Sequence, residues 1–243
     1  MCTVAIIGPD GAGKSTITRR LERELPIPTK YVYMGVNLEA SHYMLPTTRL
    51  IVELKRWRGG RPDMAGPADP ARAKPRSTNL LKCVAGDLKS SMRLANLMAE
   101  EWFRQILTWY YQRRGYVVLF DRHFFSEYYA SEIAVNGAGR PLANRIHGAM
   151  LKHLYPRPDF IICLDAPAEV LFARKGEGTI ELLARRRQEY LQLRHVVARF
   201  ATVDATLPED EVTRRVAELV VGFHAERSGR APAADRGRGQ PTV

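Results

Sequence analysis

Residues 2–26 have the sequence CTVAIIGPDGAGKSTITRRLERELP, and this stretch decides the fold. Its first part, residues 3–7, is a continuous apolar run rich in β-branched side chains, which predicts a buried strand. A glycine-rich loop follows. Apolar residues spaced four apart then predict a helix over residues 14–25, which Pro26 stops. The order of strand, glycine-rich loop and helix indicates a site for an anion.

The loop GPDGAGKS, residues 8–15, has the spacing G-x-x-x-x-G-K-[ST] of a phosphate-binding loop. Its glycines let the backbone N–H groups approach phosphate oxygens, and the helix that follows adds its positive N-terminus. Lys14 supplies a charge to the β- and γ-phosphates, and the Ser15 hydroxyl is a ligand for Mg²⁺. The alternative, a turn without chemistry, is disfavoured by the strand before the loop and the helix after it. The predicted nucleotide-binding residues of the loop are Gly8, Asp10, Gly11, Ala12, Gly13, Lys14, Ser15 and Thr16.

The composition is typical of a soluble globular protein, with 45% hydrophobic and 26% charged residues. The net charge of +11 suits nucleic acid, a polyanionic small molecule, or a basic surface without a specific partner. The cysteines, Cys2, Cys83 and Cys163, are too far apart for a zinc site or a disulfide framework, which suits a reducing compartment. No apolar run approaches the ~18 residues of a membrane helix, and no secretory leader is visible. We therefore expect a cytoplasmic protein without a membrane segment.

Strand patterns alternate with helix patterns along the rest of the chain. Further strands are predicted in KYVYMGV (30–36), YVVLFD (116–121), DFIICLD (159–165) and ATVDA (201–205). Helices are predicted over residues 91–114, 142–154, 167–172, 180–200 and 209–227. This alternation predicts an α/β, three-layer P-loop fold, in which helices flank a parallel β-sheet and ligands bind beyond the carboxyl ends of the strands. One domain is expected over 1–227, with a flexible insertion at 59–79 and a disordered tail at 228–243.

The chain has no N-K-x-D motif of the kind that reads guanine in nucleotide-dependent switches. Instead, VVLFDRH (117–123) places Asp121 and Arg122 at the end of a predicted strand. Asp121 is suited to hold Mg²⁺ through water, and Arg122 to clamp a second anion with two hydrogen bonds. The alternative is a surface ion pair. Together with the phosphate loop, the pair indicates transfer of a phosphoryl group rather than a hydrolytic switch.

A cluster of cations surrounds a short glycine-containing segment further along: Arg174, Lys175, Arg185, Arg186 and Arg187. Mobile arginines that close over a phosphoryl group neutralise the charge that spreads over its oxygens. Neighbouring residues on a helix point about 100° apart, so at most two of the three consecutive arginines face one ligand. The alternative is a solvated helix face.

Four stretches in the same order resemble the thymidylate kinase family of nucleoside monophosphate kinases, and they cover about half of the chain. They are GPDGAGKST, DRHFFSEYYA, LDAPAEVLFARK, and RRRQEYLQL with FATVDATLPEDEV. The resemblance implies a P-loop kinase domain over 1–227 that uses ATP and Mg²⁺. It also implies transfer of the γ-phosphoryl group to a small phosphate acceptor, a nucleoside monophosphate with dTMP as the first expectation. A homodimer is a further implication.

The resemblance also implies roles for individual residues. Asp10 faces the acceptor's sugar, Arg122 holds the acceptor's phosphate, and Ser15 and Asp121 serve the metal. The implied lid cations are Arg174 and one of residues 185–187, for which we take Arg185. The implied catalytic residues are thus Lys14, Asp10, Arg122, Arg174 and Arg185, and Asp204 and Ala205 are implied to lie near adenine.

Two segments depart from the family pattern, and both belong to the acceptor side. YMGVNLEASHYMLP (33–46) replaces an Arg-Glu-Pro-Gly-Gly-Thr-like segment, and NLMAEEWFRQ (96–105) replaces an acidic-Arg-Ala pattern in the helix that helps to read thymine. Neither Arg104 nor Gln105 can be aligned with that arginine. Side chains at the place where an acceptor is read are Asn37, Ser41, His42 and Tyr43, which could equally be ordinary polar loop residues.

These departures leave two alternatives open: a kinase of the same fold for another nucleotide or a sugar phosphate, and a nucleotide-regulated nucleic-acid-binding protein. The second is disfavoured, because aromatic side chains that would stack on bases are absent from the basic tail, and the insertion has only Trp57 at its edge.

Overall fold

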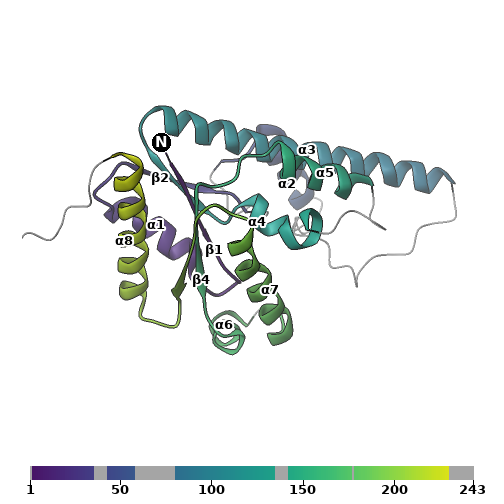
Figure 1. Cartoon of the computed structure of the whole chain (residues 1–243). Coiled ribbons are helices and arrows are strands. Elements are labelled where there is room, and N and C mark those ends of the chain that lie inside the picture. Colours follow the sequence, from purple (N-terminus) through teal and green to yellow (C-terminus); the bar gives the residue numbers. More distant parts are fainter. Residues whose placement is uncertain (1, 36–42, 58–79, 135–141, 177, 230–243) are drawn as a thin grey trace, which may run out of the picture.

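The computed structural model describes residues 2–35, 43–57, 80–134, 142–176 and 178–229 (Figure 1). The predicted insertion at 59–79 and residues 230–243 of the predicted tail lie outside the described residues. Within them, five parallel strands form one sheet in the order β2-β3-β1-β4-β5. The strands are β1 (Thr3–Ile7), β2 (Thr29–Tyr33), β3 (Val117–Asp121), β4 (Phe160–Asp165) and β5 (Phe200–Asp204). The predicted α/β class and parallel sheet are confirmed.

The register of the sheet brings the two predicted phosphate-contacting segments together. Ile6 of β1 pairs with Asp121 of β3, so the loop after β1 and the Asp121-Arg122 pair leave the sheet side by side. On the other side of β1, Ile7 pairs with Cys163 of β4. Because all these pairings are parallel, the carboxyl ends of the strands share one edge of the sheet, where ligands bind in such folds.

Eight α-helices connect and cover the strands in the described ranges. They are α1 (Lys14–Glu24), α2 (Pro46–Trp57), α3 (Leu80–Arg113), α4 (Phe124–Tyr128), α5 (Leu142–His153), α6 (Ala168–Lys175), α7 (Ile180–Gln192) and α8 (Glu209–Arg227). A π-helical turn, η3 (Tyr129–Ile133), follows α4, and a 3₁₀ turn, η4 (Leu193–His195), follows α7. The predicted bounds of α8 are confirmed.

Two helix predictions had wrong bounds, and two helices were missed. The predicted helix over 180–200 ends at Gln192, because Phe200 pairs with Ile161 of β4 and opens a strand instead. Here sheet pairing outweighs the helical spacing of apolar residues. Helix α3 begins at Leu80 rather than at residue 91. Helices α2 and α4 were not predicted at all.

Side chains of β1 alternate between two cores, one on each face of the sheet. Val4 and Ile6 pack in a cluster with residues of α1 and α8, whereas Ala5 and Ile7 pack with residues of α4 and α5. Figure 1 shows α1 and α8 on one side of the strands and α4 and α5 on the other. The three-layer arrangement is therefore confirmed, and it buries β1 on both faces, as its continuous apolar sequence predicts.

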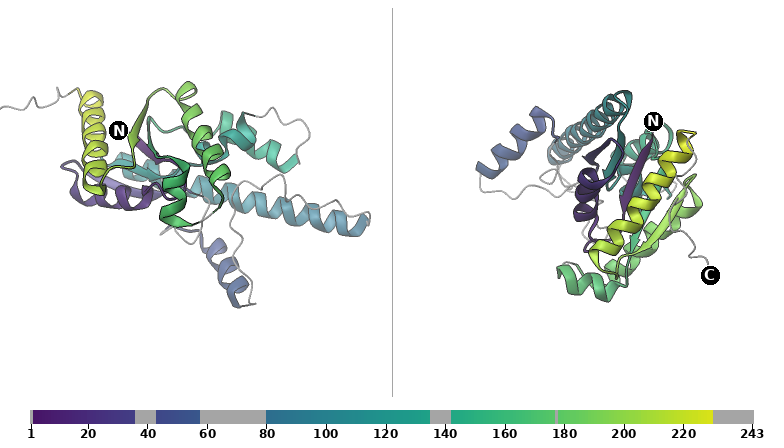
Figure 2. Two further views of the ribbon diagram at one scale, coloured as in Figure 1. Left: turned by 90° about the horizontal axis from the view of Figure 1, so that it is seen from below. Right: turned by 90° about the vertical axis from the view of Figure 1, so that its left-hand side faces the viewer.

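Helices α2 and α3 reach beyond this layered body. Figure 2 shows α2 projecting from the fold, and the first turns of α3 running past the other helices. Leu50, Leu54 and Trp57 of α2 are exposed. Within the described ranges, no helix has both the length and the apolar character needed to cross a membrane.

Candidate active site

The phosphate loop between β1 and α1 is held by contacts that only glycine allows. Gly8 has φ 143°, and a Cβ atom there would lie 2.4 Å from the carbonyl oxygen of Leu164 in β4. Gly11 has φ 89°, and a Cβ atom there would lie 2.8 Å from the carbonyl oxygen of Leu171 in α6. The loop is thus pressed against the neighbouring strand and helix, with its glycines in conformations that other residues rarely adopt.

Lys14, the first residue of α1, has a buried side chain that turns back over this loop. Its Nζ donates a hydrogen bond to the carbonyl oxygen of Pro9 at 2.7 Å and lies 3.9 Å from Oδ1 of Asp10. Burial, reinforced by the nearby Arg122, lowers the pKa of Lys14 to about 8. The ammonium group is therefore in a desolvated position, where its attraction to a phosphate oxygen is stronger than in water.

Oxygen ligands for a magnesium ion are available around the loop. Ser15 lies exposed in the first turn of α1. Asp121 is fully buried, and its Oδ2 accepts a hydrogen bond from the Tyr31 hydroxyl at 3.0 Å, whereas its Oδ1 has no hydrogen-bond partner in the described part of the chain. A buried carboxylate oxygen without a partner, together with a hydroxyl, suits Mg²⁺. The described residues hold no cluster of three or more His, Cys, Asp and Glu side chains that could bind a metal alone.

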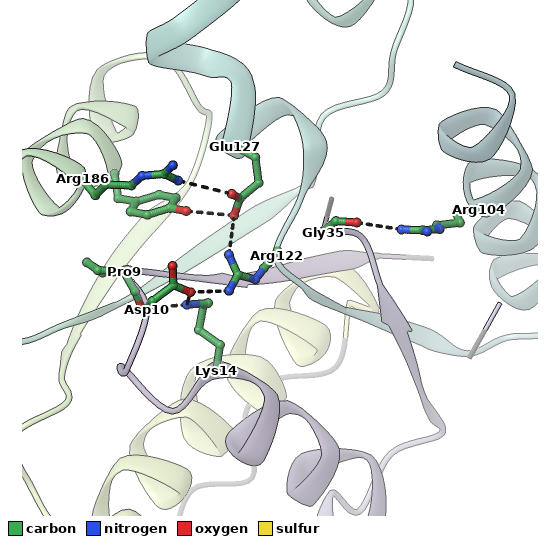
Figure 3. A network of polar contacts seen from close by, with 9 residues as sticks. Pro9, Asp10, Lys14, Gly35, Arg104, Arg122, Glu127 and Arg186 are labelled. Atoms are coloured by element: carbon green, nitrogen blue, oxygen red, sulfur yellow. Dashed lines mark hydrogen bonds and ion pairs between the residues drawn. The ribbon is translucent and has the colours of Figure 1, made fainter. Parts of the chain in front are cut away.

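Arg122 adopts a strained backbone conformation directly after β3. Its φ is 68°, and no other non-glycine residue in the described ranges has a positive φ. Its Nη2 lies 2.5 Å from Oδ1 of Asp10, and its Nη1 lies 3.5 Å from Oε1 of Glu127 (Figure 3). Such strain, of order 1–3 kcal/mol, persists where surrounding contacts enforce it and is common at functional sites.

The contact between Asp10 and Arg122 joins the phosphate loop to the end of β3. Burial raises the pKa of the Asp10 carboxyl, but the charges of Lys14 and Arg122 outweigh it and hold the pKa well below its usual range. Lys175 of α6 adds to this effect. Asp10 is therefore ionised at neutral pH. The structure thus brings Lys14, Asp10 and Arg122 together, as the sequence predicts.

The three consecutive arginines of α7 point in different directions. Arg185 is exposed and pairs with Glu189 on its own helix at 3.9 Å. Arg187 forms two hydrogen bonds to Asp165 at the end of β4, at 2.6 and 2.8 Å. Arg186 points toward Glu127, at 3.9 Å, and so toward the network around Arg122 (Figure 3). The structure therefore brings Arg186 to the site and leaves Arg185 on the surface of its helix.

Two further predicted groups lie at the end of β5. Asp204 accepts hydrogen bonds from the backbone N–H and the hydroxyl of Thr206, at 2.8 and 2.6 Å. The carbonyl oxygen of Ala205 accepts a hydrogen bond from Nη1 of Arg174 at 2.8 Å. Arg174 thus connects α6 to the β5 end of the sheet.

A buried arginine on α3 is the main feature of the acceptor side. Arg104 is fully buried, and its Nη1 donates to the carbonyl oxygen of Gly35 at 2.9 Å (Figure 3). The same nitrogen lies 3.3 Å from the carbonyl oxygen of Tyr33, to which it also donates. Its Nη2 lies 3.7 Å from Oε2 of Glu100, and neither its Nε nor its Nη2 has a hydrogen-bond partner in the described part of the chain. Burial lowers the pKa of Arg104. A buried guanidinium with unused donors is suited to bind a ligand oxygen.

The sequence did not predict Arg104 as a site residue, because neither it nor Gln105 could be aligned with the family pattern there. Its i,i+4 spacing from Glu100 was the available signal. Of the other acceptor-side predictions, Asn37, Ser41 and His42 lie outside the described residues. The hydroxyl of Tyr43 lies 2.9 Å from that of Tyr111.

A parallel sheet with a phosphate loop after β1, an Asp-Arg pair after β3 and one arginine of α7 directed toward that pair defines a P-loop phosphotransferase. The chain is 30% identical to a protein named probable thymidylate kinase from Pyrobaculum aerophilum over 228 residues, 90% of this chain and 96% of that protein. The chain belongs to the thymidylate kinase family and is a kinase.

Other relatives agree with this assignment. A thymidylate kinase from Xanthomonas oryzae pv. oryzae is 28% identical over an aligned length of 251 residues, 97% of this chain and 90% of that protein. A probable thymidylate kinase 1 from Saccharolobus solfataricus is 31% identical over 110 residues, 43% of this chain and 54% of that protein. No protein-family model matches the chain. The kinase prediction is confirmed, and the alternative of a nucleic-acid-binding protein is not favoured.

Proposed function

We propose that this kinase transfers the γ-phosphoryl group of ATP to dTMP. The names of the relatives support this acceptor. The observation that carries the proposal is the contact of Arg122 with Asp10, beside Lys14 and at the edge of the phosphate loop. The contact supports the proposal, because a cation suited to a second phosphate lies next to the groups that we propose bind the first.

The nucleotide end of the proposed site is the loop of residues 8–16. Its backbone N–H groups and Lys14 hold the β- and γ-phosphates of ATP. Ser15 and Asp121 are the residues that would hold Mg²⁺, Asp121 through water, and the ion would neutralise charge on the phosphates. Asp204 and Ala205 would lie beside adenine at the end of β5.

The acceptor end begins at Arg122. In our proposal its guanidinium binds the phosphate of dTMP, while Asp10 turns toward the sugar. Binding then exchanges one anionic partner of Arg122, the Asp10 carboxylate, for another. Arg104 is our proposed contact for the base, because it has buried donors without partners on the acceptor side.

The proposed reaction is an in-line displacement. A phosphate oxygen of dTMP forms a bond to the γ-phosphorus, and the bond from that phosphorus to the bridging oxygen of ADP breaks. A phosphate oxygen is already ionised at neutral pH, so no general base is required. Catalysis comes from positioning and from neutralising charge, for which Lys14 and Arg122 supply cations on either side.

We propose Arg186, instead of Arg185, as the α7 arginine that neutralises the transferred group. Its support is the direction of its side chain, toward Glu127 and Arg122. Arg174 keeps its proposed role as the α6 cation, although its guanidinium contacts the Ala205 carbonyl in this structure.

Two organisational proposals follow the family assignment. Residues 1–227 form the kinase domain, which ends with α8.

The second proposal is that the chain forms a homodimer through α3, since Ile106, Trp109 and Tyr110 are exposed on that helix. Sedimentation equilibrium of the full chain and of Ile106→Glu tests the dimer: we expect a dimer that the substitution weakens, and a monomeric wild type would refute it.

The experiment that tests the proposed acceptor measures ADP release from ATP and Mg²⁺ with a panel of nucleoside monophosphates and sugar phosphates. We expect release with dTMP at a kcat/KM higher than with any other acceptor. Release with another acceptor and none with dTMP would retain the kinase but overturn the substrate.

A further inference from the structure

Glu127 is a buried carboxylate that the proposed chemistry does not use. It lies on α4, shortly after Arg122, and only 1% of its side chain is exposed. Three groups from two other parts of the chain converge on it. Oε1 accepts a hydrogen bond from the Tyr190 hydroxyl at 2.8 Å and lies 3.5 Å from Nη1 of Arg122, and Oε2 lies 3.9 Å from Nη1 of Arg186 (Figure 3).

Two of the groups around Glu127, Arg122 and Tyr190, have pKa values that their surroundings raise. Burial disfavours the charged form of Arg122, but Glu127 and Asp10 outweigh it and raise the pKa of that guanidinium. Burial, with the nearby Glu127 charge, raises the pKa of Tyr190 well above its usual value. The phenol therefore stays protonated and remains a hydrogen-bond donor to Glu127 across the working pH range of a kinase.

Arg122 has two carboxylate partners, and they differ in accessibility. Asp10 belongs to the phosphate loop, and 36% of its side chain is exposed, so an incoming anion can replace it at Nη2. Glu127, a residue of α4, is buried beneath α7 and contacts the other terminal nitrogen of Arg122, Nη1. A phosphate group that displaces Asp10 leaves Arg122 anchored through Glu127.

We propose that Glu127 is a positioning residue that directs Arg122 and Arg186 toward the transferred phosphoryl group. This inference rests on the proposed function, in which Arg122 binds the acceptor's phosphate. One carboxylate connects the acceptor arginine after β3 to the α7 arginine, so both cations are oriented before the substrates arrive. If Glu127 loses its charge, Asp10, whose Oδ1 lies 2.5 Å from Nη2, remains as the carboxylate partner of Arg122. The acceptor must then compete with Asp10 for a guanidinium that is turned toward the phosphate loop.

The test is Glu127→Gln, which keeps the volume of the side chain and an oxygen for the Tyr190 hydroxyl but removes the charge. We expect kcat to fall ~10–100-fold and the KM for dTMP to rise, while the dissociation constant for ATP stays within about twofold. A purely structural role would impair the binding of both substrates together. The matched control is Glu189→Gln on α7, a partly exposed glutamate that pairs with Arg185, for which we expect wild-type kinetics.

A double-mutant cycle with Arg186→Ala tests whether Glu127 acts through that arginine. We expect the loss caused by Glu127→Gln to be at least ~3-fold smaller in the Arg186→Ala background than in the wild type. If Glu127→Gln does not fold, Tyr190→Phe removes only the phenol donor and should shift the same constants by a smaller factor.

Wild-type kcat and KM in Glu127→Gln, or fully additive losses in the cycle, would overturn the inference and leave the proposed function intact. A wild-type protein that releases no ADP with any nucleoside monophosphate would instead refute the proposed function, and the inference with it.

Discussion

The phosphate loop and the acceptor side meet at the contact between Asp10 and Arg122, and they are assembled in different ways. Residues 8–16 supply the proposed phosphate-binding groups in one continuous run that joins a strand to a helix. On the acceptor side, Arg104, Arg122 and Glu127 come from α3, the end of β3 and α4. The first half depends on local backbone geometry, and the second depends on how distant segments pack.

The two halves also hold their charges differently. The Lys14 ammonium contacts the carbonyl oxygen of Pro9 and the partly exposed carboxylate of Asp10, and an incoming phosphate can displace both. Arg104 and Glu127 are enclosed by protein, and removing either of them leaves a buried partner behind. Buried charged groups are costly to retain. Lys14 and Asp121 are buried as well. The enclosure of Arg104 and Glu127 therefore supports our proposal that the acceptor side contributes to specificity, while the loop provides general phosphate binding.

The largest effect is expected for Lys14→Ala. Loss of the buried ammonium beside the loop should lower kcat by ~1,000-fold or more, equivalent to about 4 kcal/mol of transition-state stabilisation. The measurement is steady-state ADP release with ATP, Mg²⁺ and dTMP. Lys152→Ala, an exposed lysine of α5, serves as the control and should retain wild-type turnover. Wild-type turnover in Lys14→Ala would show that the loop is not the nucleotide site.

A smaller effect distinguishes the arginines of α7. Arg186→Ala should lower kcat ~100-fold because its guanidinium faces the network around Arg122, whereas Arg185→Ala should change it by less than about twofold. The same ADP assay measures both. The reverse order would restore Arg185 as the cation of the site and would mean that α7 rotates when substrates bind.

The smallest effect concerns pH. The pKa of Lys14 is lowered to about 8 in the ligand-free protein, so it loses its proton, and its charge, as the pH rises through that value. ATP affinity should therefore fall above pH 8, by at most about tenfold per pH unit, since one proton is linked to binding. Isothermal titration calorimetry between pH 7 and 10 measures the dissociation constant for ATP. Lys14→Arg, which does not titrate there, should bind less tightly but with a flat profile; an equally steep profile would assign the titration elsewhere.

These differences explain which parts of the molecule the sequence could predict. The strand, loop and helix over 3–25 follow from local patterns, and the structure agrees nearly residue for residue. The strands at 117–121 and 160–165 were predicted for the same reason, as continuous apolar runs. Prediction failed where tertiary contacts decide the structure. The helix predicted over 180–200 ends at Gln192, and Phe200 instead begins β5, which pairs with β4.

The site divides in the same way. Lys14, Ser15 and Asp121 could be found from motifs and strand ends, because their neighbours in sequence are also their neighbours in space. Glu127 was not predicted, because its partners lie up to 63 positions away in the sequence. The residues around it form no pattern that predicts a buried carboxylate. The choice among residues 185–187 depends on the rotation of α7 against α4, which no local pattern specifies.

The most direct test of this division measures how tightly ATP and dTMP each bind to wild type, Lys14→Ala and Arg122→Ala, by isothermal titration at pH 7. The account predicts a crossed pattern. Lys14→Ala should weaken ATP by ~100-fold and dTMP by less than about threefold, and Arg122→Ala should do the opposite. Equal losses of both ligands in Arg122→Ala would contradict the assignment of Arg122 to the acceptor and, with it, the separation of the site into two halves.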